Sequence, residues 1–239
     1  EDVLIYERPD EPDMGFGTTI TEDETYLVIH VWEGTEEKSR IYYRPLANPQ
    51  AEFTRFLDDF EANYYLLGHI DGQFIIYTTL HAPKGRIVSM PVCDPTAITE
   101  VVAEGQHTLQ SSKLVGTKLV IEYLADAKSE IRVVNLADGE MESIELPGLG
   151  SAGGFSGRQE SPELFYWFTS PLHPPQVFRY DLHSKEIATF RKPGLDLDPE
   201  RYTVRQEFVT SKDGTKFPVL IAHRKDIEWE GNNPTLLYG

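Results

Sequence analysis

Three patterns in the sequence contain residue types that could do chemistry, and the first would bind a nucleotide. A G-x-G-x-x-G pattern at residues 148–153 matches the loop that cradles a dinucleotide pyrophosphate. That chemistry needs a strand before the loop and a helix after it, so that the helix N-terminus faces the phosphates. The next pattern in the sequence is a strand starting at Glu163, with no helical periodicity before it. We therefore interpret the glycines as a crossing between two sheets and expect no nucleotide cofactor.

The second pattern would supply a nucleophile. Ser156 lies in a Gly-x-Ser-Gly-Arg sequence, which resembles the G-x-S-x-G elbow of serine hydrolases but lacks its second glycine. The elbow also needs a strand-to-helix turn to expose the serine hydroxyl, and no helical pattern follows. No other serine, histidine and acid arrangement is visible, so we predict no catalytic residue in this chain.

The third set of residues consists of potential metal ligands. The seven histidines are scattered, without the H-x-H or H-x-x-x-H spacing of metal ligands. The one cysteine, Cys93, excludes a multi-cysteine zinc site and an intrachain disulfide. Asp196 and Asp198 lack the glycine and glutamate that complete a calcium loop. We expect no metal.

Composition excludes several partners. The 239 residues include 22 Lys and Arg against 39 Asp and Glu, a net charge of −17, which disfavours nucleic acid. No stretch approaches the ~20 apolar residues of a membrane helix. The sequence starts without Met and shows no basic leader, and we expect it to be a piece of a longer polypeptide. We expect a cytoplasmic location, with the periplasm as the alternative.

A repeat of about 46 residues organises the first four fifths of the chain. Apolar runs begin at residues 25, 73, 118 and 163, so that their starts are 48, 45 and 45 residues apart. A second set of apolar runs follows them at residues 41, 87, 131 and 177. Four short strands per repeat are typical of a β-propeller blade. The sequence predicts an all-β fold with four blades, at 15–58, 60–103, 107–147 and 150–192, and residues 1–8 as the outer strand of a preceding blade.

Two alternatives to this interpretation remain open. The residues Phe53, Phe56, Leu57 and Phe60 have the i, i+3, i+4, i+7 spacing of an amphipathic helix, although the repeat requires an outer strand there. An up-and-down barrel or a sandwich would also give many short strands, but the regular period favours the propeller.

The repeat ends near residue 193, at a Lys-Pro-Gly sequence. Residues 202–210 and 215–223 read as two long strands around a turn that contains Lys212, Asp213 and Gly214. We therefore divide the chain into a partial propeller, 1–193, and the linker and first strands of a second domain, 194–239.

The chain resembles the prolyl oligopeptidase family of serine peptidases, in which a seven-bladed propeller caps an α/β-hydrolase domain. The segments that carry the resemblance cover nearly the whole chain: 8–12 with 14–16, 163–170, 180–182, 211–216 with Pro218, and 234–239. The first is similar to the start of the family's fourth blade, and the next two to its seventh. The last two are similar to the first hairpin of the hydrolase domain and to the strand before its oxyanion region.

The resemblance implies that the intact protein is a serine endopeptidase that cleaves short peptides after proline. A serine would attack the carbonyl, a histidine would take its proton and an aspartate would orient the histidine. In the family's order all three lie beyond Gly239, so the chain alone is expected to be inactive. The propeller would gate access to the cleft, and the partners would be the remaining blades, the hydrolase domain and short proline-containing peptides.

The resemblance also implies a set of cavity-lining residues: Met14, Gly15, Phe16, Trp32 and Thr35. The sequence departs from a known member, which has arginine where Trp32 stands and cysteine where Thr35 stands. Trp32 could instead wall an apolar subsite. The alternative is that Phe16 and Trp32 only pack between blades.

Two other functions stay open beside this one. The chain could be a stand-alone propeller that binds partners without catalysis, or it could belong to an oligopeptidase of other specificity, such as one that cleaves after basic residues.

Overall fold

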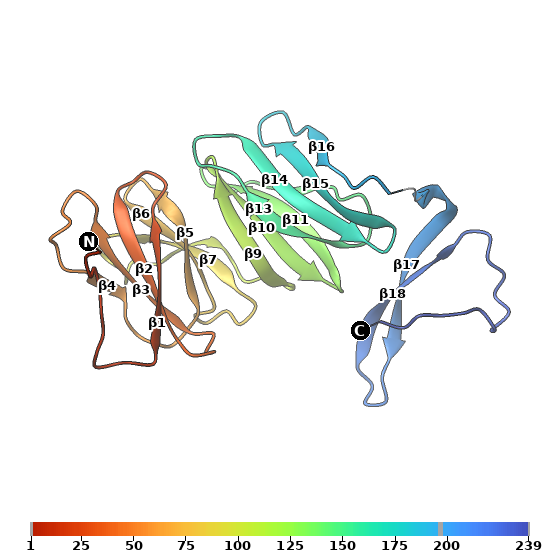
Figure 1. The fold of residues 1–239 in the computed structure, drawn as a ribbon, viewed down its shortest axis with the longest axis horizontal. Helices are drawn as coiled ribbons and strands as arrows, with labels where there is room; N and C mark the ends of the chain where they lie inside the picture. Colours follow the sequence, from red (N-terminus) through yellow and green to blue (C-terminus); the bar gives the residue numbers. More distant parts are fainter. Residues whose placement is uncertain (1, 196–197, 239) are drawn as a thin grey trace.

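The computed structural model describes residues 2–195 and 198–238, and nearly all of their regular structure is β-strand. Four antiparallel sheets of four strands each follow one another along the chain, and a two-stranded hairpin comes last (Figure 1). The all-β prediction and its blade pattern are therefore confirmed. No helix in the described ranges is long and apolar enough to cross a membrane.

Each sheet is a simple up-and-down meander in sequence order. The first sheet contains β1 (Met14–Ile20), β2 (Tyr26–Glu33), β3 (Ser39–Pro45) and β4 (Thr54–Leu57). The second contains β5 (Tyr64–Ile70), β6 (Gln73–Thr78), β7 (Arg86–Pro91) and β8 (Thr99–Val102). The third contains β9 (Thr108–Val115), β10 (Lys118–Ala125), β11 (Lys128–Asn135) and β12 (Met141–Ile144). The fourth contains β13 (Ser151–Ser156), β14 (Glu163–Ser170), β15 (His173–Asp181) and β16 (Ile187–Arg191).

The segment around Phe56 settles the choice between a helix and an outer strand. Thr54–Leu57 forms β4, and Leu57 pairs with Ile41 of β3. Phe56 is buried between the first and second sheets, whereas Phe60 lies beyond the strand beneath the Arg40 guanidinium. The helical spacing of these aromatic residues is thus a coincidence of one strand and its two flanks.

The core consists of apolar layers between consecutive sheets, because each sheet has side chains on both faces. Val28 and Ile41 of the first sheet meet Phe74 and Ile76 of the second. Equivalent layers join the second sheet to the third and the third to the fourth. Burial of both faces explains why the strands read as short, nearly continuous apolar runs.

A serine at the start of the third strand fastens some neighbouring sheets together. The Ser39 hydroxyl accepts from the Tyr64 amide and donates to the Tyr64 carbonyl, both at 2.8 Å. Ser129 occupies the equivalent position in the third sheet and accepts from the Ala152 amide at 2.9 Å. Both serines are buried, so these bonds fix the start of the next sheet's first strand.

The first strands of the four sheets contribute to one inner cavity. Residues of β1, β5, β9 and β13 border one cavity of about 370 Å³. We call the end where these strands begin the hairpin end, because the chain leaves β16 there and continues into the final hairpin. The opposite end, with the turns at 21–25, 71–72, 116–117 and 157–162, is the distal end.

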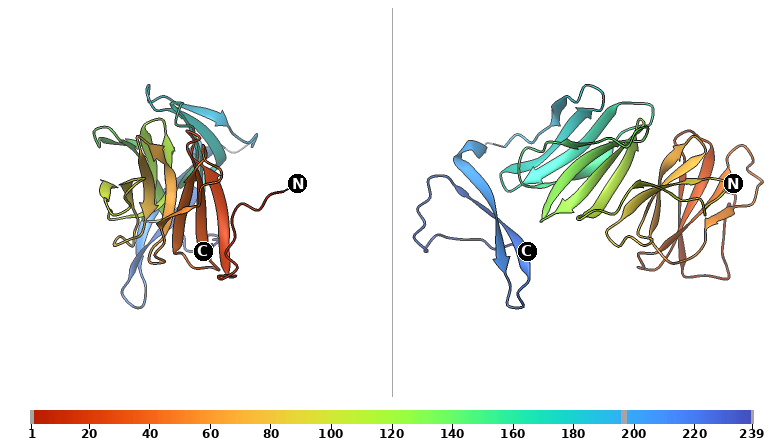
Figure 2. Two further views of the ribbon diagram at one scale, coloured as in Figure 1. Left: turned by 90° about the vertical axis from the view of Figure 1, so that its left-hand side faces the viewer. Right: turned by 180° about the vertical axis from the view of Figure 1, so that it is seen from behind.

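The final hairpin consists of β17 (Tyr202–Thr210) and β18 (Lys216–Arg224), preceded by the single-turn 3₁₀ helix η1 (Pro199–Arg201). The strands agree with the sequence prediction within one residue. Figure 2 shows the hairpin beside the fourth sheet, and the Gln206 side chain donates to the Asp126 carbonyl of the third sheet. Residues 225–238 form no strand. The predicted pair Asp196 and Asp198 lies partly, and Gly239 wholly, outside the described residues.

One strand prediction stays a prediction. Residues 1–8 were expected to be the outer strand of a preceding blade, and no such blade is among the described sheets; residues 2–8 have no regular structure, and Glu1 lies outside the described range. No described strand pairs with them. The segment is held instead by the Tyr6 ring, which makes edge contacts with Phe16, Tyr42 and Phe53.

Candidate functional site

Gly15 and Trp32, two of the predicted cavity residues, form one unit at the hairpin end. They are direct cross-strand partners in β1 and β2. The indole of Trp32 lies so close over β1 that a Cβ built on Gly15 would be 2.4 Å from its Cε2 atom, and one on Gly17 3.3 Å from Cζ3. Trp32 remains 39% exposed. The pair therefore presents a flat aromatic surface, which we call the first indole shelf.

A second indole shelf lies in the fourth sheet. Trp167 of β14 pairs with Gly153 of β13, and its ring also covers Gly154, where a Cβ would be 2.6 Å from the indole Nε1. Trp167 is 40% exposed. The sequence analysis placed Trp167 in a strand but did not single it out. The available signal was a tryptophan in the second strand opposite a glycine in the first, as for Trp32 and Gly15.

Met14 and Phe16 lie on the opposite face of the first sheet from the Trp32 shelf. Successive residues of a strand alternate between faces, and Met14 packs with Ile29 and Val31. Phe16 makes an edge contact with Tyr6 at 5.4 Å between ring centroids. The structure thus brings Gly15 and Trp32 together but does not bring Met14 and Phe16 to the same surface.

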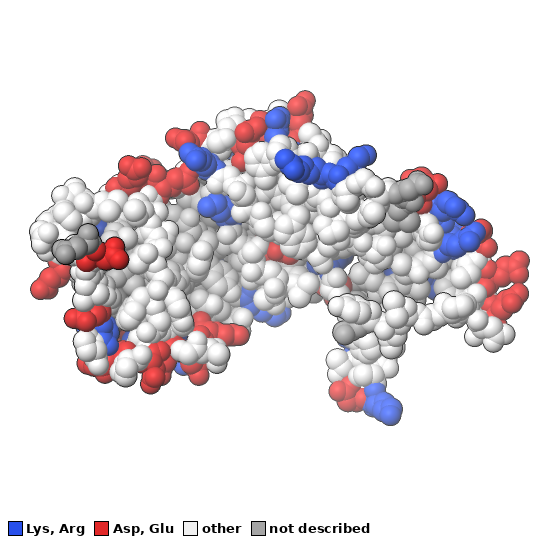
Figure 3. All heavy atoms as spheres, in the orientation of Figure 1, with Lys and Arg blue, Asp and Glu red and all other residues white. Residues whose placement is uncertain are grey.

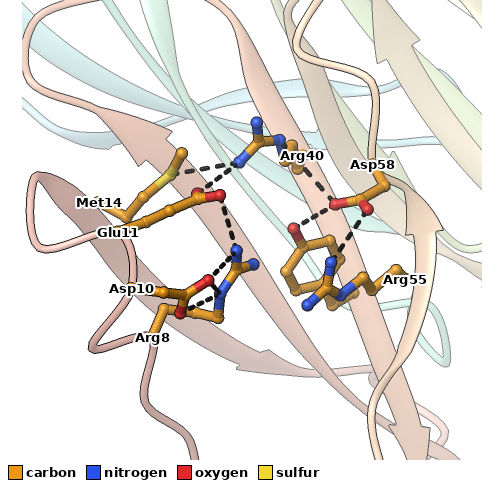
Figure 4. A network of polar contacts seen from close by, with 8 residues as sticks. Arg8, Asp10, Glu11, Met14, Arg40, Arg55 and Asp58 are labelled. Atoms are coloured by element: carbon orange, nitrogen blue, oxygen red, sulfur yellow. Dashed lines mark hydrogen bonds and ion pairs between the residues drawn. The ribbon is translucent and has the colours of Figure 1, made fainter.

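A charged network borders Met14 on that face (Figure 4). The Arg40 guanidinium contacts the Met14 sulfur at 3.4 Å and Glu11 at 3.2 Å, and Glu11 also pairs with Arg8 at 2.7 Å. Arg8 in turn forms a two-bond contact with Asp10. These ion pairs hold residues 8–11 against β3, so their role in the described chain is positional.

Asp58 extends this network from the end of β4. Its carboxylate accepts from the Tyr42 hydroxyl and from Arg55 at 3.3 Å. Burial would raise the pKa of Asp58, but these two bonds outweigh it and the pKa lies below its usual value. Burial, assisted by the bond to Asp58, raises the pKa of Tyr42 to about 12. Both groups therefore keep their ordinary charge states near neutral pH and are not suited to proton transfer.

Thr35 lies in the turn between β2 and β3, at the hairpin end. It borders a shallow cavity of about 380 Å³ whose other walls include Glu36, Glu37, Lys38 and Glu61. Thr35 and Trp32 therefore share an end of the propeller but open onto different surfaces. The acidic walls favour a polar or cationic group there.

Two patterns that the sequence analysis set aside, Ser156 and the glycines at 148–153, lie in or next to β13. Ser156 is exposed on β13, and in the described ranges its hydroxyl has no hydrogen bond to a histidine or a carboxylate. The glycine pattern at 148–153 leads into that strand instead of a helix, which agrees with the rejection of a nucleotide loop. No group of three potential metal ligands occurs among the residues that could be searched. On the face seen in Figure 3, Lys and Arg are interspersed with Asp and Glu.

Comparison with known proteins gives consistent matches over the whole chain. A family model described as "Prolyl oligopeptidase, N-terminal beta-propeller domain" matches residues 1–193. A prolyl endopeptidase of Elizabethkingia miricola is 32% identical over 240 residues, which cover 100% of this chain and 34% of the relative. A prolyl endopeptidase of Dictyostelium discoideum is 27% identical, with the same coverage. The chain thus spans about a third of the length of the curated relatives it matches.

Solved structures give the same result for the fold. A structure from a structural and mechanistic analysis of two prolyl endopeptidases has a TM-score of 0.83 and 28% identity, covering 95% of this chain and 34% of that one. The apo structure of prolyl oligopeptidase B from Galerina marginata has a TM-score of 0.86 at 22% identity, again over 95% and 34%. The second match supports the fold alone.

Proposed function

The chain belongs to the prolyl oligopeptidase family, as its sequence resemblance indicated, and from that premise we propose that it is the propeller part of a peptidase that cleaves short peptides after proline. The observation that carries the proposal is the match of this entire chain to about a third of each prolyl endopeptidase. The catalytic serine, histidine and aspartate would lie in an α/β-hydrolase domain, of which residues 194–239 would supply the linker and first strands.

In this proposal the propeller admits flexible peptides and excludes folded proteins. The cavity inside β1, β5, β9 and β13 is about 370 Å³, which is the scale of a small-molecule or peptide site and far below that of a protein domain. Trp32 and Thr35 lie at the hairpin end, where the hydrolase domain would follow. These two residues would line the active-site cavity between the propeller and the hydrolase domain, with Gly15 as the support for the Trp32 ring. Met14 and Phe16 would contribute only through the opposite face of the same sheet.

The test separates the chemistry of the intact protein from that of this chain. A fluorophosphonate probe, which reacts with activated serines, should label the intact protein and leave the 239-residue chain unlabelled. A Gly-Pro reporter substrate should be hydrolysed by the intact protein and not by the chain. Labelling of the isolated chain would assign the nucleophile to it and return Ser156 to consideration.

Two further outcomes would change the function. If the intact protein hydrolyses a reporter with a basic residue before the bond and not the prolyl one, the specificity is that of another oligopeptidase. If neither the protein nor the chain reacts, the propeller is a binding module without catalysis. A cytoplasmic location remains part of the proposal and is tested by cell fractionation.

A further inference from the structure

Two partly buried histidines lie on the seam between the first and second sheets, and their hydrogen bonds differ in kind. His30 of β2 accepts a hydrogen bond from the Leu66 amide of β5, with 3.4 Å between the amide nitrogen and Nε2. His69, near the end of β5, contacts the Asp23 carboxylate through Nδ1 at 2.7 Å. One histidine of the seam therefore accepts a bond from the opposite sheet, and the other donates one.

The bond to His30 exists only while the ring is neutral. A neutral imidazole has one nitrogen that carries a proton and one that accepts, so Nε2 accepts here and Nδ1 carries the proton. In the protonated ring both nitrogens donate, and Nε2 would direct its own proton at the amide proton of Leu66. Burial also lowers the pKa of His30 below its usual value of about 6.5. The neutral ring is thus the form that fits the seam.

The contact of His69 responds differently to acid. An ionised carboxylate can only accept, so His69 Nδ1 donates to Asp23 in both charge states of the ring. Burial would raise the pKa of Asp23, but bonds from threonines and from His69 hold it well below its usual value. The Asp23 carboxylate therefore stays charged in mild acid. Protonation of the two rings removes the bond to His30 and keeps the bond from His69.

The strands around His30 bring no charged side chain to its ring. Its cross-strand partners are Gly17 in β1 and Ile41 in β3. Glu33, the acidic residue of β2, is three positions along the strand and so on the opposite face. From β5, the titratable residue in contact is Tyr65, whose ring centroid is 5.0 Å from that of the imidazole. Burial alone accounts for the lowered pKa of His30, so the response to acid comes from desolvation and the amide bond.

The amide that His30 accepts belongs to the wall of the inner cavity. Residues 65–68 of β5 border the cavity of about 370 Å³. The pairing of β5 with β6 shifts register between Leu66 and Gly68, and such a bulge interrupts the regular hydrogen bonds of a sheet. The bond to His30 therefore supports this part of the wall from the neighbouring sheet, at the point where its own sheet supports it least.

We propose that His30 is an acid-sensitive support of the cavity wall, which holds residues 65–68 to the first sheet when neutral and releases them when protonated. The support is fully present above about pH 6.5 and is lost as the pH falls through the lower pKa of the folded state. The release is local, because the Ser39 hydroxyl still donates to the Tyr64 carbonyl and the Asp23 contact remains. It involves no peptidase chemistry and does not rest on the proposed function.

Hydrogen exchange of the intact protein, followed by mass spectrometry of peptides that cover residues 64–70, measures the release. After correction for the intrinsic exchange rate, these amides should exchange about fivefold faster near pH 5 than near pH 7.5, because a supporting hydrogen bond is lost. A peptide that covers β10 should keep its protection and serves as the internal reference for global unfolding. Equal corrected rates for residues 64–70 at the two pH values would overturn the proposal.

Three variants assign the response to His30. His30→Gln should remove the difference between the two pH values, because a glutamine oxygen can accept from the amide but does not titrate. His30→Leu offers no acceptor and should exchange rapidly at both pH values, which keeps the test decisive if the glutamine variant does not fold. His183→Gln is the matched control, since His183 is exposed in the turn between β15 and β16, and it should keep the native response. A His30→Gln protein that kept the native response would also overturn the proposal.

Discussion

Replacing Gly15 with alanine tests whether the first indole shelf is real. The built Cβ would be 2.4 Å from Cε2 and 2.5 Å from Nε1 of Trp32, a separation that two carbon atoms do not tolerate. Gly15 has no positive φ, so alanine meets no backbone penalty there. Any destabilisation must then come from the ring, which has to leave β1 or push it aside.

The magnitude follows from two opposing terms. Overpacking a well-filled contact costs about 1–3 kcal/mol, whereas alanine in place of glycine in a strand gains about 0.5–1 kcal/mol. Gly15→Ala should therefore lower the free energy of unfolding by about 1–2 kcal/mol. Gly17→Ala should cost less than about 1 kcal/mol, because its Cβ would be 3.3 Å from the ring edge. In a Trp32→Ala background, Gly15→Ala should become neutral or stabilising by up to about 1 kcal/mol.

Urea denaturation followed by far-ultraviolet circular dichroism measures all four proteins of this double-mutant cycle without relying on tryptophan emission. A coupling of about 2 kcal/mol between Gly15 and Trp32 is expected, since the two residues are in direct contact. A coupling below about 0.5 kcal/mol, the range of independent sites, would refute the shelf. Equal costs at Gly15 and Gly17 would show that strand composition, and not the ring, controls stability here.

Three further predictions concern two buried residues, Tyr166 and Ser129, and Asp23 in the turn between β1 and β2. Tyr166→Phe should be neutral or stabilising by up to about 1 kcal/mol in thermal unfolding, because its buried hydroxyl has no hydrogen-bond partner among the described residues; a clear loss would reveal a missed partner. Ser129→Ala should destabilise by about 1–3 kcal/mol in urea denaturation, because it leaves the buried Ala152 amide without an acceptor; an unchanged midpoint would contradict the fastening role. Burial would raise the pKa of Asp23, but bonds from threonines and His69 hold it well below its usual value, so Asp23 contributes stability above about pH 4 that is lost as the pH falls toward its folded-state pKa. The stability difference between the native protein and Asp23→Asn should therefore be largest above pH 4 and shrink in more acidic solution, and a difference that grows with acid would contradict the assignment.

The blade pattern could be predicted because its signal is repeated. A single apolar run such as 73–78 is ambiguous between a strand and a buried helix segment. Four such runs at a spacing near 46 residues, each followed by a second short apolar run, favour four-stranded blades, and β6 spans those very residues. The same repetition correctly overruled the local helical spacing around Phe56. Residues 1–8 precede the first described sheet, so the strand expected there, as part of a preceding blade, stays a prediction.

The candidate site could be predicted only in part, because it depends on cross-strand register and on loops. Trp32 and Gly15 were named from the resemblance, but nothing in their sequence positions showed that they touch. Met14 and Phe16 flank Gly15 in sequence, and strand alternation sends their side chains to the other face. The bond between Gln159 and Glu22 joins residues 137 positions apart, a distance at which neither periodicity nor motif carries information.

Several glycines of the first strands have side chains of other strands or loops packed directly against them. Gly15, Gly68 and Gly153 lie on three of the four inner strands, and none has a positive φ. Each instead has side chains packed closely against it, namely Trp32 at Gly15, Leu114 and Gln159 at Gly68, and Trp167 at Gly153. Both tryptophans belong to second strands, so at Gly15 and Gly153 the first strand supports a ring from its neighbour. Substitutions at these three glycines should therefore act by displacing the neighbouring side chains, above all at Gly15, where a Cβ would be 2.4 Å from Cε2 of Trp32.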